Sequence, residues 1–459
     1  MSSQYDIYRA ANRRLEALID PNPAHDSSLR EVQARAAQRL KAMAAFLDYL
    51  GNPHRSAPVI HVGGTSGKGS TATAIAAILS ASGRSTLLHT SPFLQVSTEK
   101  LQIDGRLIDA PLFAELTDEV IDAAGRYNQI HLTYGEAWVA IVALAMARLK
   151  PDVAVIEVGA GGRFDLTNVV DSSVAVITTI GLDHTETLGP TIPEIAWHKA
   201  GIIKKANLVV AHGVEQPEAR AEIDRQAAQV GVSSLIRIDP AALQIEQTDD
   251  GHPTWRDPVT GTRLKAGTPG LPQAQNGALA VAAARAFVPD LDLAAIEQGL
   301  AQTRIAARFE RMPGQGMVIL DGAHNAQKVG AIIPDLMRLP RPRVGVIGFL
   351  AAKRSDEMID LLGPALDHVV VARPDVLGKP GREIAHAAES VRARVPVPVV
   401  AAQSPVDAVQ IAEGIAGANG SVIVTGSLYL CGAVRERWYA GREIIEQKTQ
   451  WPGTNPRPS

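Results

Sequence analysis

His61-Val-Gly-Gly-Thr-Ser-Gly-Lys-Gly-Ser70 is the stretch of sequence that decides the fold. A short β-branched run, Val59 to Val62, leads into it, and an alanine-rich segment, Ser70 to Ser82, follows it. Strand, glycine-rich loop and helix together make one half of a parallel α/β unit. In such a loop the backbone N–H groups turn inward around phosphate oxygens, and the start of the helix adds a favourable dipole. The stretch therefore predicts a phosphate-binding loop at the end of a buried strand.

Lys68 is the residue of this loop that would reach the β- and γ-phosphates of a nucleotide, and Ser70 or Thr71 could assist at the start of the helix. The strict P-loop pattern is not met, because Val62 stands where the first glycine would be and Gly69 follows the lysine. A tight strand–helix turn is the structural alternative, but such a turn does not require a lysine. The residues expected to bind phosphate are Gly64, Thr65, Ser66, Gly67, Lys68, Gly69 and Ser70.

Further apolar runs after the loop predict a parallel sheet that is covered on both faces. Each run is largely continuous, which is typical of buried parallel strands, whereas half-exposed strands alternate. These runs are Thr86 to His89, Val153 to Val158 and Val174 to Ile180. Helices are predicted over Leu29 to Leu50, from the helical spacing of its apolar residues, and over Glu136 to Leu149. The polar, turn-rich stretch from Arg237 to Gly267 is expected to be a surface excursion or a small hairpin.

A second series of strands and helices begins after Gln302. Its predicted strands and helices are Met317 to Leu320, Arg343 to Ile347, Ser355 to Leu362, His368 to Val371, Val397 to Ala401, Pro405 to Ala416 and Ser421 to Thr425. The predicted fold class is therefore α/β, with a P-loop ATPase domain built on a parallel sheet over 1–302 and a Rossmann-like α/β domain over 303–448. The Pro-rich, polar residues 449–459 are expected to form a disordered tail.

The composition of the 459 residues fits a globular protein of two domains. Hydrophobic residues make up 46% and charged residues 20%, so neither long disorder nor a fibrous repeat is expected. With 45 Lys and Arg against 48 Asp and Glu, nothing predicts a nucleic-acid partner or binding to an anionic membrane. The single cysteine, Cys431, cannot form an internal disulfide, and no segment resembles a signal peptide or a membrane span. We expect a cytoplasmic monomer that acts on small molecules.

A glutamate and a histidine stand where an open parallel sheet holds its ligands, at the carboxyl ends of strands. Glu157 ends an apolar run and is soon followed by glycines, and His184 follows another run, beside Asp183. Such a pair suits Mg²⁺ bridging nucleotide phosphates, with water and substrate oxygens completing the shell. Taken singly, Glu157 could be a solvated charge and His184 a capping or packing residue. The nearby phosphate loop favours the metal-binding interpretation for both.

The amino-acid sequence of the loop resembles that of a known protein family. Gly64-Thr-Ser-Gly-Lys-Gly-Ser70 resembles the phosphate loop of the Mur ligase superfamily, and its Gly-Ser ending resembles the folylpolyglutamate synthase and dihydrofolate synthase branch. Other matching motifs stand in the family's order: Leu50-Gly-Asn-Pro-His54, Thr90-Ser-Pro-Phe-Leu94, Glu157-Val-Gly-Ala-Gly-Gly-Arg163, Asp165 with Thr167-Asn-Val169, Gly181-Leu-Asp-His184, Lys199-Ala-Gly-Ile-Ile203, Arg308-Phe-Glu310, Asp321-Gly-Ala-His-Asn325 and Gly426-Ser-Leu-Tyr-Leu430. The resemblance covers most of the chain and implies a Mur-ligase-like central domain followed by a Rossmann-like glutamate ligase domain.

The resemblance implies an ATP-dependent ligase that joins L-glutamate to a folate-type carboxylate through an acyl-phosphate. ATP and two Mg²⁺ ions are the implied cofactors, with Ser91 and Glu157 on one ion and His184 on the other. Lys199 matches a family lysine that is carbamylated. An ammonium there would be repelled by two Mg²⁺ ions, whereas a carbamate reverses the charge. His198 stands where the family usually has glutamate, which makes the neighbourhood of Lys199 less acidic.

The second domain is implied to hold the nucleotide from the opposite side, so that domain closure would assemble the site. Arg308 and Asp321 match nucleotide-holding residues of that domain, and we assign Asn276 of the first domain to the nucleotide site as well. His324 and Ser427 match positions associated with placing glutamate. The residues expected to take part in catalysis are Lys68, His184, Lys199 and His324.

The acceptor is expected to be dihydropteroate, a folate glutamate or both. One alternative is a Mur-type ligase acting on a UDP-muramyl peptide; by family resemblance those ligases carry a larger UDP-binding domain where this chain has about sixty residues. An alternative of another class is a P-loop nucleotide-binding switch that is not a ligase. The motif Asp321-Gly-Ala-His-Asn325 in a second α/β domain argues against that class.

Four places depart from the family's usual sequence. Ile305-Ala-Ala307 replaces Trp-Pro-Gly, Ala352-Lys-Arg354 replaces Asp-Lys-Asp, and Gly135 replaces a phenylalanine before Glu136. The loop after Ser91-Pro92 usually carries several arginines, and the residues at those positions here are Thr98, Lys100 and Gln102. In the family that loop lies near the pterin or folate end of the acceptor. The departures therefore leave the ATP chemistry intact and leave the acceptor open.

Overall fold

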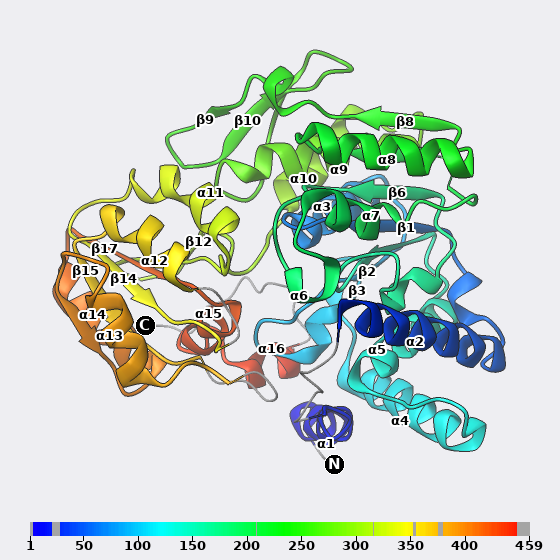
Figure 1. Ribbon diagram of the computed structural model, residues 1–459, viewed down its shortest axis with the longest axis horizontal. Helices are drawn as coiled ribbons and strands as arrows, with labels where there is room; N and C mark the ends of the chain where they lie inside the picture. The colour runs from blue at the N-terminus through cyan, green and yellow to red at the C-terminus, as the bar shows by residue number, and fades with distance from the viewer. Residues whose placement is uncertain are drawn as a thin grey trace.

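The computed structural model describes residues 3–20, 28–207, 209–314, 316–351, 355–374 and 380–447. The first half of the chain is built on an eight-stranded sheet of order β4-β3-β2-β5-β1-β6-β7-β8 (Figure 1). The six strands from β2 to β8 in this order are parallel, and β3 and β4 add an antiparallel edge. The strands are β1 Val59–Gly63, β2 Thr86–His89, β3 Leu101–Ile103, β4 Arg106–Leu107, β5 Val153–Glu157, β6 Val174–Ile177, β7 Val209–His212 and β8 Ser234–Arg237.

Helices cover both faces of this sheet, as the continuous apolar strands predict. Alternate residues of the central strands face two different clusters: Ile60 and Val155 pack with α3, α9 and α10, whereas Ala154 packs with α4 and α5 and Ala175 with α7 and α8. The helices of this half are α1 Gln4–Glu16, α2 Leu29–Tyr49, α3 Lys68–Ala81, α4 Ala110–Tyr127, α5 Tyr134–Leu149, α6 Thr185–Leu188, α7 Ile192–Ala200, α8 Pro217–Val230, α9 Pro272–Phe287 and α10 Leu293–Gln302.

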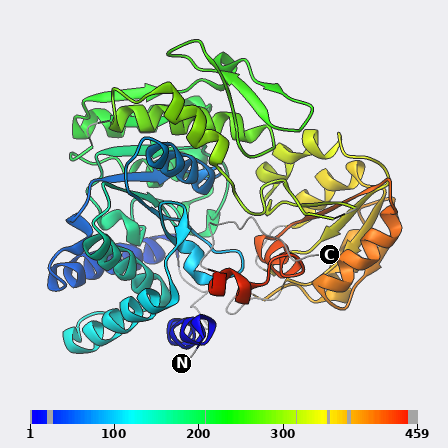
Figure 2. The same cartoon turned by 180° about the vertical axis from the view of Figure 1, so that it is seen from behind.

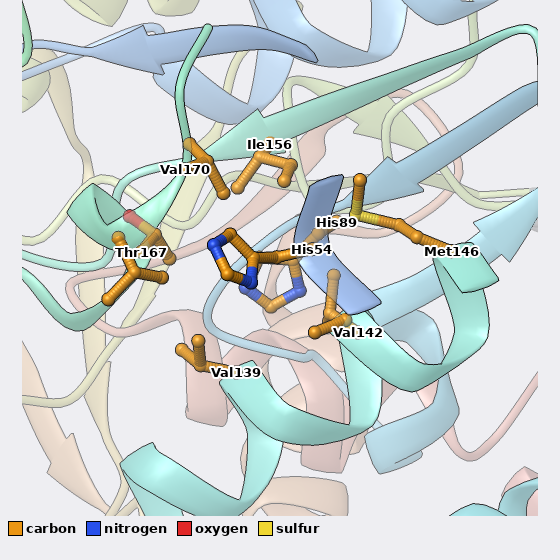
Figure 3. A pocket seen from close by; sticks show the side chains of 10 residues that line it. His54, His89, Val139, Val142, Met146, Ile156, Thr167 and Val170 are labelled. Atoms are coloured by element: carbon orange, nitrogen blue, oxygen red, sulfur yellow. The ribbon is translucent and has the colours of Figure 1, made fainter. Parts of the chain in front are cut away.

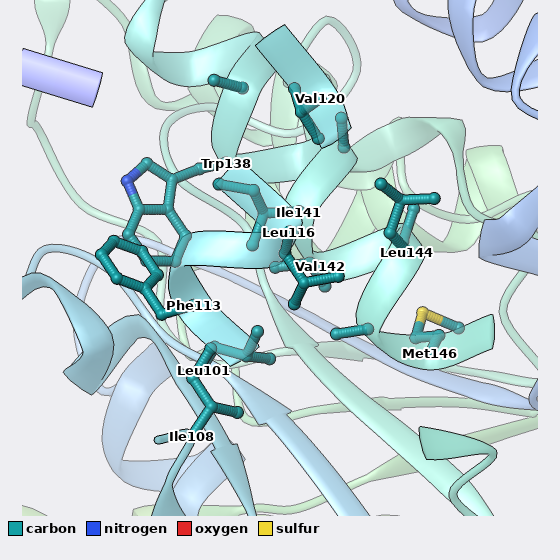
Figure 4. Close-up of a cluster of buried hydrophobic side chains, with 14 of the residues drawn as sticks. Leu101, Ile108, Phe113, Leu116, Val120, Trp138, Ile141, Val142, Leu144 and Met146 are labelled. Carbon is teal, nitrogen blue, oxygen red and sulfur yellow. The ribbon is translucent and has the colours of Figure 1, made fainter. Parts of the chain in front are cut away.

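The helix that follows the phosphate loop is fixed from behind by a close helix crossing. A Cβ at Gly299 of α10 would lie 2.4 Å from the Cα of Ile78 of α3, so only glycine allows the two backbones to approach this closely. On the opposite side of the sheet, α4 and α5 enclose an aromatic and aliphatic core, in which the rings of Phe113 and Trp138 stack 5.7 Å apart (Figure 4). Both packings hold helices against the faces of the sheet.

The stretch predicted as a surface excursion is a three-stranded antiparallel sheet of order β11-β10-β9. Its strands are β9 Glu246–Gln247, β10 Pro253–Arg256 and β11 Arg263–Lys265. Trp255 of β10 is fully buried and lies against Gly277 of α9, where a Cβ would come within 2.6 Å of the indole ring. The small sheet is therefore anchored to the first half by its tryptophan.

The second half is a six-stranded sheet of order β12-β13-β17-β14-β15-β16 flanked by helices (Figures 1 and 2). All neighbouring strands are parallel except the edge pair β12 and β13. Its elements are β12 Glu310–Arg311, β13 Met317–Leu320, α11 Ala326–Leu336, β14 Arg343–Ile347, α12 Ser355–Leu362, β15 His368–Val371, α13 Ile384–Arg392, β16 Val399–Ala401, α14 Pro405–Ala416, β17 Ser421–Thr425, α15 Leu428–Arg435 and α16 Gly441–Gln447.

Two predictions fall outside the described residues: the disordered tail over 449–459 and the replacement at Ala352-Lys-Arg354. Within the described part of the chain, no helix is both long enough and apolar enough to cross a membrane. The apolar stretch around Ile180 ends earlier than expected, since β6 stops at Ile177 and the chain then turns toward the phosphate loop. This early end places Thr178 and Thr179 against that loop.

Candidate active site

Three neighbouring strand ends of the first sheet converge on one place. β1 lies between β5 and β6, so the loop that follows β1 is flanked by Glu157 at the end of β5 and by Thr178 after β6. The Thr65 N–H donates to the carbonyl of Thr179 over 2.7 Å, and the Thr178 hydroxyl donates to the carbonyl of Ser66 over 2.6 Å. The phosphate loop is thus held in shape by the neighbouring strand end.

Two glycines of the loop are required by their surroundings. Gly64 has φ +139°, and a Cβ there would lie 1.9 Å from the Thr178 hydroxyl oxygen. Gly67 has φ +83°, and a Cβ there would lie 2.2 Å from the side-chain oxygen of Asn276. Both conformations disfavour any other residue. Asn276, which we assigned to the nucleotide site from sequence, therefore borders the loop directly from α9.

Two lysines meet at one carbonyl of the loop. Lys68 Nζ donates to the Gly64 oxygen over 3.2 Å, and Lys199 Nζ, from α7, donates to the same oxygen over 2.8 Å. Lys199 is only 3% exposed. Burial, and secondly the charge of Lys68, lower the pKa of Lys199 well below its usual value. The structure therefore brings the predicted Lys199 to the loop, as a buried amine with a lowered pKa.

The neighbouring residue of Lys199 adds little positive charge. Burial lowers the pKa of His198 to about 4, so its ring is neutral near pH 7. Its Nε2 lies 3.0 Å from the side-chain nitrogen of Gln33, and its ring contacts those of Phe164 and Trp197 edge-on. His198 is thus a packing residue of α7, and its replacement of the family's glutamate leaves a neutral group beside Lys199.

Glu157 is a buried carboxylate that faces the phosphate loop. It accepts a hydrogen bond from the Ser91 N–H over 2.7 Å, so the structure brings together the two residues predicted for the first metal ion. A Cβ at Gly69 would lie 3.3 Å from one of its oxygens, so the missing side chain keeps this face of the carboxylate open. Burial raises the pKa of Glu157, and the charge of Lys68 opposes that rise. Such a carboxylate fits a divalent cation.

The described residues hold no group of three or more His, Cys, Asp or Glu side chains that could bind a metal ion by themselves. This is compatible with Mg²⁺, which keeps several waters and binds through one or two carboxylates plus phosphates. His184 precedes α6 in the left-handed conformation with φ 52°, and it is exposed, unlike Glu157. Its role in binding a second ion stays a prediction.

The corresponding edge of the second sheet carries Asp321, directly after β13. Its carboxylate is buried and accepts the Phe309 N–H and the Ala323 N–H, each over 2.9 Å. Burial raises the pKa of Asp321, and the Arg308 guanidinium acts in the opposite direction. Arg308 and Asp321 therefore lie together, and Asp321 fixes the backbone directly after Arg308 and the turn that follows Asp321 itself.

His324 and Ser427 lie on adjoining loops, because β13 and β17 are neighbours and the Gly426 N–H donates to the carbonyl of Ala323 over 2.9 Å. The Ser427 hydroxyl is buried and has no hydrogen-bond partner within the described residues. Since buried polar groups are normally satisfied, this hydroxyl is suited to a ligand. The structure thus juxtaposes the loops of the two residues assigned to glutamate.

Contacts between the two halves were not predicted from the sequence. The Ser66 hydroxyl of the phosphate loop donates to the side-chain oxygen of Gln327 over 3.2 Å. The Asn325 amide donates to Asp183 over 3.1 Å, and Lys328 Nζ lies 3.8 Å from the same carboxylate. The first turn of α11 therefore touches the loops after β1 and β6. The only signal for this in the sequence was that Asn325 and Asp183 belong to two of the matching motifs.

The three residues that replace the family's arginines are buried rather than presented to a ligand. Thr98, Lys100 and Gln102 are at most 8% exposed. Lys100 Nζ lies 4.5 Å from the ring centre of Trp138 and 4.9 Å from that of Tyr134, a cation–π arrangement. Gln102 donates to the carbonyl of Glu99 over 3.2 Å, so Lys100 and Gln102 stabilise the loop after Ser91 from inside.

Gly135 and Glu136, at the start of α5, mark another departure. The Arg39 guanidinium bonds both oxygens of Glu136, over 2.7 and 2.9 Å, and lies 3.7 Å from the position of a Cβ at Gly135. Leu166 lies 3.1 Å from the same position. The space beside Gly135 is therefore bounded by Arg39 and Leu166.

Two hollows lie near these elements. One is a small cavity of about 10 Å³ between β5 and α5, lined mostly by apolar side chains, with Thr167 and the rings of His54 and His89 (Figure 3). Burial lowers the pKa of His89 to about 3, and the cavity has room for no more than a water molecule. The other is a polar groove of about 350 Å³ between α1, the loop at Gln95 and the start of α16. Of these two hollows, the groove is the one with room for a substrate.

The comparisons with known proteins cover both halves of the chain. The Mur ligase middle domain matches residues 62–284, and the Mur ligase glutamate ligase domain matches residues 307–428. The chain is 33% identical to the folylpolyglutamate synthase of Lacticaseibacillus casei, over 88% of this chain and 95% of that protein. It is 32% identical to the dihydrofolate synthase/folylpolyglutamate synthase of Mycobacterium tuberculosis, over 91% and 95%.

Solved structures give the same result. The Mycobacterium tuberculosis folylpolyglutamate synthase complexed with ADP superimposes with a TM-score of 0.80 at 31% identity, over 89% of this chain and 97% of that one. The E. coli FolC structure in complex with DHPP and ADP gives a TM-score of 0.75 at 28% identity, over 90% and 98%. The two matched domains are those of a Mur ligase. Within that class, this chain belongs to the folylpolyglutamate synthase and dihydrofolate synthase family. The predicted fold class and family are confirmed.

Proposed function

We propose that this protein joins L-glutamate to the carboxyl group of a folate-type acceptor, with ATP converted to ADP and phosphate. It is an ATP-dependent ligase that forms a C–N bond. The observation that carries the proposal is the apposition of two matched halves: the phosphate loop with Glu157 and Lys199 in the first, and the loops of His324 and Ser427 in the second. Contacts from Gln327 and Asn325 to the first half support a site between them.

The binding of ATP is assigned to the phosphate loop. Its backbone N–H groups and the start of α3 would surround the phosphates, and Lys68 would exchange its bond to the Gly64 carbonyl for a phosphate oxygen. Glu157 and Ser91 would hold Mg²⁺, which neutralises phosphate charge and orients the phosphates when bound. Asn276 would border the nucleotide beside Gly67, and Arg308 would approach it from the second half.

The reaction has two bond-forming steps. The acceptor carboxylate attacks the γ-phosphorus, the bond to ADP breaks, and an acyl-phosphate forms. The amine of glutamate then attacks the acyl carbon, phosphate leaves, and the amine loses a proton as the amide forms. Most of the rate in phosphoryl transfer comes from positioning and charge stabilisation. Lys68 in the first half and Arg308 in the second supply fixed positive charge for both steps.

Lys199 is proposed to act as a carbamate. Carbamylation joins an uncharged amine to CO₂ with release of a proton, and burial together with Lys68 lowers the pKa of Lys199 in the required direction. The product is an anion beside the loop that could orient the acyl group or bind a cation. We expect Lys199→Ala to be nearly inactive and to be partly restored by short carboxylates. Robust activity without rescue would refute this role, and so would crystallographic density for a bare amine with both metal ions bound.

The polar groove is proposed to take the acceptor. It is joined to the metal site by the short loop from Ser91 to Val96, whose last two residues line the groove. Arg9 and Arg13 of α1 line the opposite side and suit an acceptor that carries carboxylates. We expect Arg13→Ala to raise the KM for the acceptor while the KM for ATP stays constant. The reverse pattern would show that the acceptor lies elsewhere.

The decisive experiment is a screen of ADP release that crosses acceptors with amino acids. Dihydropteroate, tetrahydrofolate and a UDP-muramyl peptide are each combined with glutamate, aspartate, glutamine, alanine and lysine. Release that requires both a folate-type acceptor and glutamate supports the proposal. Release with the UDP-muramyl peptide would favour the Mur-type alternative, and release without either substrate would favour a nucleotide switch. The product then shows whether the α- or γ-linkage is made.

A further inference from the structure

The first turn of α11 places a lysine between the two halves of the protein. Lys328 Nζ lies 3.0 Å from His324 Nε2 and 3.8 Å from an Asp183 oxygen. Asn325 caps the same turn through the Lys328 N–H and also bonds Asp183. The side chain of Lys328 is 21% exposed, so it lies at the edge of the interface and can still reach a solute. No motif in the sequence drew attention to it.

The protonation state of His324 follows from its two partners. Its Nδ1 lies 2.8 Å from the carbonyl oxygen of Gly322, and since a carbonyl only accepts, Nδ1 carries the proton. Its Nε2 then accepts from the Lys328 ammonium, which only donates. His324 is therefore a neutral ring while Lys328 is charged. A neutral imidazole cannot form an ion pair with a carboxylate, so the positive charge at this place comes from Lys328.

The incoming amino acid needs such a charge. Glutamate carries two carboxylates, and its binding residues, His324 and Ser427, are both uncharged in this arrangement. The phosphate end has its own cation, since Lys68 lies at the loop. We propose that Lys328 binds a carboxylate of the incoming amino acid and selects for glutamate. His324 holds the Lys328 ammonium in place through their hydrogen bond. This deepens the proposed function by assigning the charge that recognises glutamate.

The contact with Asp183 is long enough to be exchanged. At 3.8 Å it is beyond a hydrogen bond, so a substrate carboxylate that binds Lys328 does not have to displace a hydrogen bond to Asp183. The Asp183 carboxylate attracts the ammonium toward the first half, where the acyl group would be. The ammonium is therefore directed toward the interface in the protein without its substrates.

The test measures KM for glutamate, KM for ATP and kcat in Lys328→Ala, Lys328→Gln and Lys328→Arg. Because a hydrogen bond to a charged group contributes about 1.5–3 kcal/mol, the first two variants should raise the KM for glutamate roughly ten- to a hundredfold. KM for ATP should change little, and the arginine variant should recover part of the loss. Replacing glutamate by glutamine and by glutamate α-amide shows which carboxylate is bound, since the variants lose discrimination for that one.

Two comparisons separate this role from others. Lys265→Ala breaks a surface ion pair of 2.8 Å with Asp250, in which neither residue belongs to α11 or to the loop after β6, and should leave all three parameters unchanged. Asp183→Asn weakens the bridge but keeps the lysine; if it matched Lys328→Ala in every parameter, Lys328 would be only a bridge and the inference would be wrong. A rise in KM for ATP instead of glutamate would assign Lys328 to phosphate. Wild-type protein without glutamate-dependent ADP release would refute the proposed function itself, whatever the variants show.

Discussion

Glu157 and Asp321 occupy equivalent places in the two halves, each at or just beyond the carboxyl end of a parallel strand, and each is buried, with a pKa that burial raises. Their surroundings differ. Glu157 accepts one backbone hydrogen bond and faces a glycine, whereas both oxygens of Asp321 are taken by backbone N–H groups. Glu157 can therefore still bind a cation, whereas the oxygens of Asp321 are already used to hold the backbone of its own domain. Similar burial and similar pKa directions thus do not imply similar roles.

The largest effect is expected for Lys68, the cation near Glu157. Lys68→Ala should lower ADP release by on the order of a thousandfold, because it removes the charge that meets the phosphates. The protein should stay folded, since Lys68 is partly exposed and its bond to the Gly64 carbonyl is local. Steady-state ADP release and a urea unfolding curve measure both. Turnover near the wild-type rate would refute the phosphate-loop assignment.

Removing the charge of Glu157 should change how activity depends on the Mg²⁺ concentration. Glu157→Gln is expected to raise the Mg²⁺ concentration for half-maximal activity by roughly ten- to a hundredfold, since an amide oxygen is a weaker ligand for a hard cation. His184→Ala should act in the same direction if that residue holds a second ion. Activity is titrated with Mg²⁺ at saturating ATP. An unchanged titration for both variants would mean that the ligands lie elsewhere.

For Asp321, we expect a change in stability and no change in the Mg²⁺ dependence. Asp321→Asn turns an NH₂ group toward the Phe309 or the Ala323 N–H, and leaving one buried donor unpaired costs about 1–3 kcal/mol of unfolding free energy. The Mg²⁺ titration should not shift. Urea unfolding of both variants side by side provides the control, because Glu157→Gln should be much less destabilised. A metal phenotype without loss of stability in Asp321→Asn would overturn the comparison.

A third carboxylate gives a smaller, pH-dependent effect. Glu99 accepts the N–H groups of Leu94, Gln95 and Val96, yet burial raises its pKa to about 7. The native state then keeps a proton that the unfolded chain releases near its usual pKa of 4.5. The unfolding free energy should therefore fall as pH rises from 4.5 to 7, by on the order of 1 kcal/mol per pH unit, and be level above that. Glu99→Gln should abolish this slope; an identical slope in urea unfolding would contradict the assignment.

Local pattern was enough to predict most strands and the phosphate loop. The runs at Met317 and Ser421 coincide with β13 and β17, because buried parallel strands are short, continuous and bounded by turns. The weakly apolar β8 at the sheet edge, whose side chains are half-exposed, was not predicted. Neither was the order of the strands, because order depends on which surfaces pack and not on spacing along the chain.

The site was predicted to the extent that its residues stand in motifs. Lys68, Glu157 and Lys199 were named from sequence, and the structure joins them through Gly64, Ser91 and Gly69. Lys328 was missed because its partners are a ring four residues away and a carboxylate of the other half. A lysine on a helix has no distinctive pattern, and only the packing of α11 against the loop after β6 gives it a role.

The hydrogen bond from Lys199 to the Gly64 carbonyl connects two equilibria: the binding of nucleotide to the loop and the reaction of Lys199 with CO₂. A carbamate would put an anion in place of the amine that now donates to this oxygen, so the loop would be held differently before and after modification. A nucleotide that binds these two states unequally must, by reciprocity, alter the affinity of Lys199 for CO₂ by the same factor. Dissolved CO₂ would then act as an effector of nucleotide affinity. Dissociation constants for ADP in CO₂-free and bicarbonate buffers measure that coupling, and equal values would show that the bond transmits none.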